Sequence, residues 1–128
     1  MEYAVECRDL THYYGKRLVF ENMNFAVRRG SIFGLLGKNG TGKTTTINIL
    51  NGFLTPAGGQ CLVFGEDSRA LTPATKARMG FLPESPYFYD YLTASEFLHL
   101  AARLSGVPGP EIEGRVHGLL RLVRMEHA

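Results

Sequence analysis

The chain has no tryptophan, only two cysteines, and no strong excess of either charge. Its 128 residues include 14 lysines and arginines against 12 acidic residues, for a net charge of +2. Because these charges are interspersed, they give no basis for a nucleic-acid-binding surface. No apolar run approaches the roughly 20 residues that span a bilayer, so we expect no transmembrane helix. The first ten residues, MEYAVECRDL, mix charged and apolar side chains, which is unlike a secretory signal.

The two cysteines, Cys7 and Cys61, lie far apart in segments that resemble strands. This small number favours buried, reduced thiols, and therefore a cytosolic protein. No metal-ligand spacing joins the cysteines to a histidine. We interpret the four histidines as surface or packing residues; they are His12, His99, His117 and His127.

What the chain does contain is a glycine-rich segment between two apolar runs. Gly37, Gly42, Lys43 and Thr44 match the phosphate-loop pattern G-x-x-x-x-G-K-[ST]. The apolar run SIFGLLG before it (31–37) predicts a buried strand. The spacing of apolar residues after it predicts a helix that ends near Gly52. A turn that binds nothing is the alternative, but the strand–loop–helix context favours phosphate binding.

Each residue type in this segment suits a triphosphate. Glycines allow the backbone N–H groups to surround phosphate oxygens, and the helix amino end adds partial positive charge. We expect Lys43 to reach the β- and γ-phosphates. The hydroxyl of Thr44 should ligate Mg²⁺, and that of Thr45 should bond the α-phosphate.

The rest of the chain predicts strands first and helices afterwards. The expected elements are strands near 5–10 and 22–28, a hairpin over 58–68, a short helix over 72–78, a strand over 79–82, a helix beginning at the capping box TASE (93–96), and a last helix from residue 110. We expect Ile112, Val116, Leu119, Leu120 and Val123 to share one side of that last helix.

Nearly the whole chain resembles the amino-terminal half of an ATP-binding cassette (ABC) transporter ATPase, as the segment from Leu10 to Asp67 shows best. The resemblance implies an α/β fold: a P-loop NTPase core of the ABC type, with an antiparallel β subdomain and the start of a helical subdomain. It places the nucleotide-binding core in 1–84 and the helical subdomain in 85–128. The family's signature motif, its Asp-Glu strand end and its switch histidine do not occur in this sequence, so we expect a truncated unit that does not hydrolyse ATP alone.

The resemblance also assigns the site. It implies that ATP is held by Tyr14, Gly37, Asn39, Gly40, Thr41, Gly42, Lys43, Thr44 and Thr45. Tyr14 would stack on adenine; Tyr13 is the second candidate, and a strand-end tyrosine packed on the sheet is the alternative. Glu84 stands where many relatives have a glutamine that contacts Mg²⁺ and the attacking water. We expect Lys43 and Glu84 to serve catalysis and Thr44 and Glu84 to serve the metal, although Glu84 could also be a solvated loop acid.

The implied function of the full-length protein is ATP hydrolysis that powers export. Its partners would be a membrane permease and a second ATPase subunit in a head-to-tail dimer, with no nucleic acid, on the cytoplasmic face of the membrane. The aromatic residues at 87–91 suit either a core or a contact with the permease. A non-transport cassette ATPase and a truncated nucleotide-binding module remain alternatives. A GTPase is disfavoured because no N-K-x-D motif occurs.

Overall fold

A four-stranded antiparallel sheet organises the first part of the chain. A computed structural model describes residues 2–36, 42–83 and 89–127, which divide into two units, Met1–Met79 and Gly80–Ala128. The division predicted at residue 84 lies outside the described residues. Each unit is described by itself.

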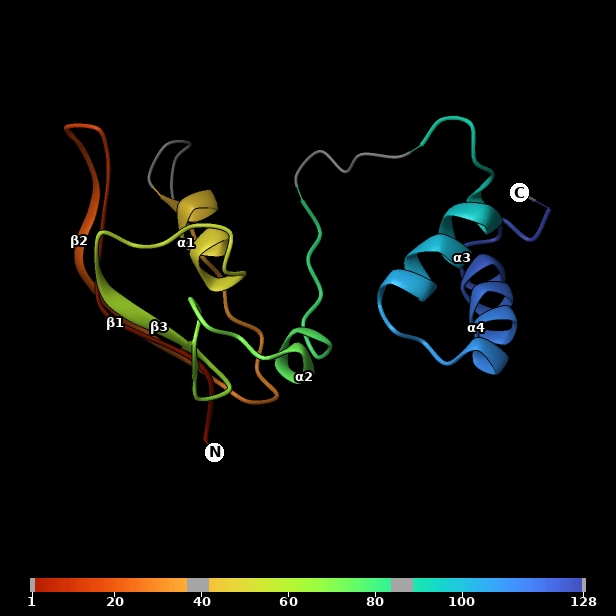
Figure 1. Cartoon of the computed structure of the whole chain (residues 1–128), viewed down its shortest axis with the longest axis horizontal. Helices are drawn as coiled ribbons and strands as arrows, with labels where there is room; N and C mark the ends of the chain where they lie inside the picture. Colours follow the sequence, from red (N-terminus) through yellow and green to blue (C-terminus); the bar gives the residue numbers. More distant parts are fainter. Residues whose placement is uncertain (1, 37–41, 84–88, 128) are drawn as a thin grey trace. The chain divides into compact units, whose positions relative to one another are not determined.

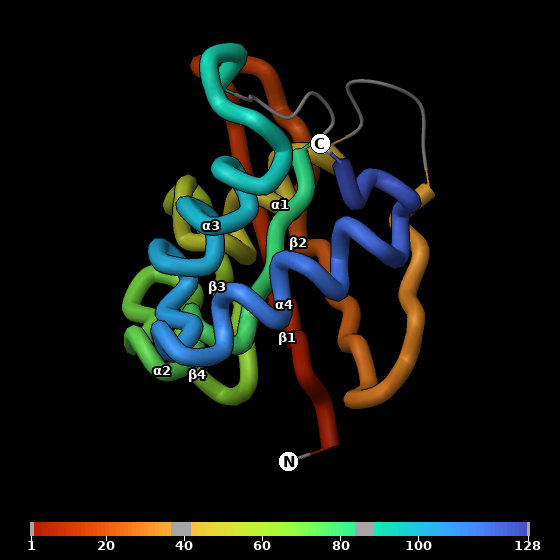
Figure 2. Tube along the Cα trace, turned by 90° about the vertical axis from the view of Figure 1, so that its right-hand side faces the viewer, coloured from red at the N-terminus to blue at the C-terminus, as the bar shows by residue number. Residues whose placement is uncertain are grey.

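The sheet has the strand order β2-β1-β3-β4. Its strands are β1 (Tyr3–Tyr14), β2 (Arg17–Arg28), β3 (Gly58–Val63) and β4 (Glu66–Asp67). β1 and β2 form a long hairpin whose two strands run side by side in Figures 1 and 2. Gly15, in the turn between them, has a φ of +61°, which favours glycine. The predicted first two strands and the hairpin over 58–68 are confirmed.

Helix α1 (Lys43–Leu50) packs against this sheet. Ile49 of α1 is fully buried in a cluster with Leu10, Cys7 and Cys61, so the core of the unit lies between α1 and strands β1 and β3. The short helix α2 (Pro73–Lys76) follows β4 and begins at Thr72, whose side chain caps it. Both helices were predicted from their apolar and capping residues.

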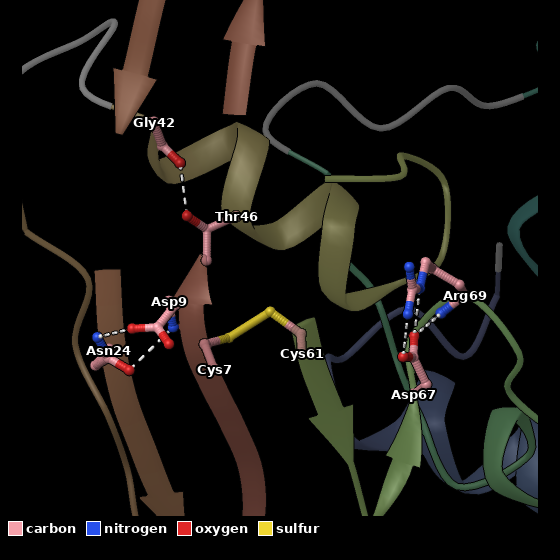
Figure 3. Close-up of a disulfide and its surroundings, with 8 residues drawn as sticks. All are labelled: Cys7, Asp9, Asn24, Gly42, Thr46, Cys61, Asp67 and Arg69. Atoms are coloured by element: carbon pink, nitrogen blue, oxygen red, sulfur yellow. Dashed lines mark hydrogen bonds and ion pairs between the residues drawn. A yellow bond between two sulfur atoms is a disulfide. The ribbon is translucent and has the colours of Figure 1, made fainter. Parts of the chain in front are cut away.

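The prediction of two reduced cysteines is wrong, because a disulfide joins Cys7 and Cys61. The prediction that both side chains are buried is correct, with exposed fractions of 2% and 0%. The physical reason lies in the register: β1 and β3 are antiparallel, and Cys7 faces Cys61 directly across the ladder. Figure 3 shows the bond spanning the two strands.

Two predicted apolar strands are absent from the described part of the chain. Residues 31–36 and 79–83 form no strand there. Ile32, Leu36 and Leu82 are 104%, 97% and 82% exposed, so the prediction of a buried strand before the phosphate loop is wrong. A strand needs a neighbour for its backbone N–H and C=O groups, and the sheet formed by β1 to β4 does not include these two segments.

The second unit is a pair of helices, α3 (Ala94–Leu104) and α4 (Gly109–Leu122) (Figure 1). The predicted capping box is confirmed: Thr93 accepts from the N–H of Glu96, and the Glu96 carboxylate accepts from the N–H of Thr93. That backbone hydrogen bond holds the pKa of Glu96 below its ordinary value. Within the described residues, no helix has the length and apolar character that a membrane crossing requires.

The side of α4 that packs is narrower than predicted. Ile112, Val116 and Leu120 are buried, and Leu98 of α3 packs against them. Leu119 of α4 and Val123, the residue that follows the helix, are 50% and 60% exposed, so the packing does not extend to these two members of the predicted side. Residues three, four, seven and eight positions apart on a helix share one side, which is why the sequence pattern groups Leu119 with Ile112 and Val116.

Candidate nucleotide-binding site

Four of the residues predicted to bind phosphate meet at the amino end of α1. Gly42 is the residue that precedes the helix, and Lys43, Thr44 and Thr45 form its first turn. The first N–H groups of a helix have no partner within it, so this end carries partial positive charge. The predicted residues Gly37, Asn39, Gly40, Thr41 and Glu84 lie outside the described residues.

Gly42 is held in a conformation and a space that favour glycine. Its φ is +96°, and it is buried. A Cβ atom there would lie 2.7 Å from Cδ2 of Phe20 and 2.8 Å from Cγ1 of Val19, both in β2. The amino end of α1 therefore lies directly against the β1–β2 hairpin.

The turn is closed from within by Thr46, which is buried. Its backbone N–H and its hydroxyl both donate to the carbonyl of Gly42, at 2.9 and 2.8 Å. Figure 3 shows the hydroxyl bond. Of the two threonines before it, Thr44 is exposed to solvent, whereas Thr45 is buried, with 6% of its surface exposed. The helix therefore offers one solvent-facing hydroxyl and one enclosed hydroxyl, on consecutive residues.

Tyr14, at the end of β1, reaches the same turn. Its hydroxyl lies 3.0 Å from Oγ1 of Thr45, within hydrogen-bond distance, and either group could be the donor. The Tyr14 side chain stays accessible, with 49% of its surface exposed. The structure thus brings together the residue predicted to stack on adenine and the residue predicted to bond the α-phosphate, although they are 31 positions apart.

Sequence reasoning missed two residues that shape this site, His12 and Phe20. The His12 ring is nearly perpendicular to the Tyr14 ring, at 84°, with the ring centroids 5.0 Å apart. His12 is 7% exposed and lies opposite Phe20 in the β1–β2 pairing. Since residues two apart on a strand share a face, the spacing of His12 and Tyr14 was the available signal. The contact of Phe20 with Gly42 had no comparable signal.

In the ranges that the structure describes, no group of three or more histidine, cysteine, aspartate or glutamate side chains lies close enough together to hold a metal ion. The exposed hydroxyl of Thr44 suits Mg²⁺, which prefers oxygen ligands and retains waters.

Comparison with known proteins decides the family. The family model described as ABC transporter matches residues 20–128. The chain belongs to the ABC transporter family. Among curated ABC relatives, the bacitracin transport ATP-binding protein BcrA of Bacillus licheniformis is 35% identical over 127 residues, which is 99% of this chain and 40% of that protein. The Nod factor export ATP-binding protein I of Cupriavidus pinatubonensis is 37% identical over 96% of this chain and 38% of that protein.

Solved ABC structures agree with the fold. A structure of an ATP-binding subunit of an ABC transporter has a TM-score of 0.83 at 35% identity, and the match covers 96% of this chain and 51% of that one. The cbiO1 protein of Clostridium perfringens, part of the cbiONQ ABC transporter complex, has a TM-score of 0.76 at 22% identity, which supports the fold alone. The predicted family and fold class are thus confirmed. The chain spans about 40% of the length of the curated relatives described above.

Proposed function

We propose that this chain binds Mg²⁺ and ATP at the amino end of α1 and contributes that site to a transport ATPase. The observation that carries the proposal is the position of Lys43, Thr44 and Thr45 in the first turn of α1, in a chain of the ABC transporter family. Backbone N–H groups, a lysine and two hydroxyls at one helix end match the needs of a triphosphate.

Each residue then has a separate task. Lys43 binds the β- and γ-phosphate oxygens through its ammonium group. Thr44 presents its exposed hydroxyl to the metal, and Thr45 donates to the α-phosphate. Bound Mg²⁺ would neutralise charge on the β- and γ-phosphates during transfer. Gly37, Asn39, Gly40, Thr41 and Gly42 complete the loop around the phosphates.

Two further residues complete the proposed site. Tyr14 stacks on the adenine ring, since its ring is half exposed and lies at the same turn. Glu84 faces the metal and the attacking water, and serves catalysis together with Lys43. The proposal for Glu84 is supported by its position after Pro83, where the family places a metal-contacting residue.

The transport role rests on the relatives. Their names describe ATP-binding proteins for bacitracin transport and Nod factor export. We therefore propose an ATPase subunit that pairs head-to-tail with a second copy, binds a membrane permease on its cytoplasmic side, and powers export. The 128 residues alone would lack the groups that complete phosphoryl transfer, and so would not turn over ATP.

A phosphate-release assay tests this proposal. The full-length gene product should release phosphate from ATP only with Mg²⁺, and Lys43→Ala should abolish the release. The isolated 128-residue chain should show none, and should be poorly protected in amide exchange because Ile32, Leu36 and Leu82 are exposed. Mg²⁺-dependent phosphate release by the isolated chain, lost in Lys43→Ala, would refute the proposal that these 128 residues alone do not turn over ATP. No release by the full-length product, with its permease present, would refute the transport ATPase itself.

A further inference from the structure

The Tyr14 hydroxyl has a role that adenine stacking does not explain. Stacking requires only a flat ring, so phenylalanine would serve equally well. The structure instead places the phenol oxygen 3.0 Å from Oγ1 of Thr45, on the first turn of α1. We infer that Tyr14 is also a positioning residue for the phosphates, because its hydroxyl orients the hydroxyl of Thr45. This inference rests on the proposed function and deepens it.

Counting donors and acceptors shows which group donates in each of these linked hydrogen bonds. A hydroxyl has one proton to donate, whereas a phosphate oxygen only accepts. When Thr45 donates its proton to the α-phosphate, the bond between the two side chains persists only if Tyr14 is the donor. The order is therefore Tyr14 O–H to Thr45 Oγ1, and Thr45 O–H to phosphate. Such linked bonds polarise one another and strengthen the terminal donor.

Burial makes this orientation matter. Thr45 is 6% exposed, so water does not readily replace a lost phenol donor. The Tyr14 ring, in turn, lies against the enclosed ring of His12, nearly at right angles. His12 thereby limits the directions in which the Tyr14 ring can turn, and the hydroxyl remains over the first turn of α1. The hydrogen bond between Tyr14 and Thr45 therefore connects the ring proposed to stack on adenine with the helix end proposed to bind the phosphates.

Two probes separate the phenol from the ring. Mg-ADP contains both a base and phosphates, whereas Mg-tripolyphosphate contains only phosphates. In the full-length gene product, Tyr14→Phe should weaken the binding of both probes about three- to tenfold, the range for one hydrogen bond. Tyr14→Ala should weaken Mg-ADP a further tenfold or more, through lost stacking, and leave Mg-tripolyphosphate as in Tyr14→Phe.

A double-mutant cycle with Thr45→Val then tests the link itself. Tyr14→Phe should cause no further loss in the Thr45→Val background, and Thr45→Ser should keep the effect of Tyr14→Phe. Tyr13→Phe is the matched control and should bind both probes as the wild type does. Circular dichroism and melting temperatures should show that the conservative variants fold alike.

Three outcomes overturn the inference. If Tyr14→Phe binds both probes as the wild type does while Tyr14→Ala loses Mg-ADP alone, only the ring matters, and the proposed nucleotide site stands. If the losses from Tyr14→Phe and Thr45→Val are additive, the phenol acts elsewhere. If the wild type binds neither probe, the proposed function fails, and the inference fails with it.

Discussion

Cys7 and Cys61 face each other across strands β1 and β3, with their Cα atoms 4.2 Å apart, and are joined by a disulfide. The two residues are 54 positions apart, so the bond closes a loop that contains β2, the phosphate-loop sequence and α1. Both side chains pack in the cluster with Ile49 of α1. The disulfide therefore joins two neighbouring strands of the sheet against which α1 packs.

Reduction of this disulfide should destabilise the chain strongly. Closing a loop of this length restricts the unfolded chain by about 4 kcal/mol in the chain-entropy treatment. Urea unfolding of the oxidised and reduced protein should differ by about that amount. The Cys7→Ala/Cys61→Ala double variant is the control, and its stability should not respond to reductant. Two free thiols in the unfolded, unreduced protein would contradict the disulfide.

Gly42→Ala should damage both the fold and the site. Alanine at a φ of +96° costs about 1–2 kcal/mol. Its Cβ would also clash with Phe20, at 2.7 Å, and crowding of a packed core adds about 1–3 kcal/mol. We expect a lower melting temperature and weaker Mg-ATP binding.

Gly34→Ala is the matched control for that substitution. A Cβ at Gly34 meets nothing within 4 Å, and its φ lies outside the positive range. Gly34→Ala should therefore keep the wild-type melting temperature. If both variants melt alike, the close approach of Gly42 to Phe20 is not important for stability.

Elements that depend on neighbouring residues could be predicted from the sequence. The capping box at Thr93 and Glu96 involves residues three apart, and it starts α3 where expected. Local alternation of apolar residues predicted strand segments within β1 and β2, but not that the two strands pair as a hairpin. The phosphate-loop pattern, which is likewise local, located the first turn of α1.

Features that depend on distant partners could not be predicted. The Cys7–Cys61 bond requires the register of β1 against β3, which no local pattern reveals. Residues 31–36 have the composition of a buried strand, but composition alone does not supply the neighbouring strand. The bond between Tyr14 and Thr45 likewise depends on how a strand end meets a helix end. The resemblance marked both residues as nucleotide ligands without predicting their contact.

The stability of the two-helix unit should fall as pH rises above about 6.5, the ordinary pKa of histidine. The Nδ1 atom of His99 lies 2.7 Å from the Ser95 carbonyl, and its Nε2 lies 2.9 Å from the Glu113 carboxylate. Both oxygens only accept, so both bonds together require the doubly protonated ring. The Ser95 bond, and then the Glu113 bond, raise the His99 pKa, while nearby Arg103 opposes them.

The raised pKa of His99 fixes the direction in which the stability of the two-helix unit changes with pH. The contribution of His99 is fully present below the unfolded-state pKa and is lost as pH rises through the folded-state pKa. An NMR titration should give His99 a pKa above that of an unfolded peptide, and the urea midpoint of this unit should drop over the same range. His99→Gln should remove that drop. A His99 pKa at or below the peptide value would contradict the paired arrangement.

The binding of Mg-ATP to the full-length gene product is the most direct test of the central claim. Isothermal titration should show one site whose affinity falls at least tenfold in Lys43→Ala, since each charge-assisted bond contributes about 1.5–3 kcal/mol. Lys76→Ala, on α2, is the matched control and should bind as the wild type does. Unchanged affinity in Lys43→Ala, with the fold intact, would show that the amino end of α1 does not hold the phosphates.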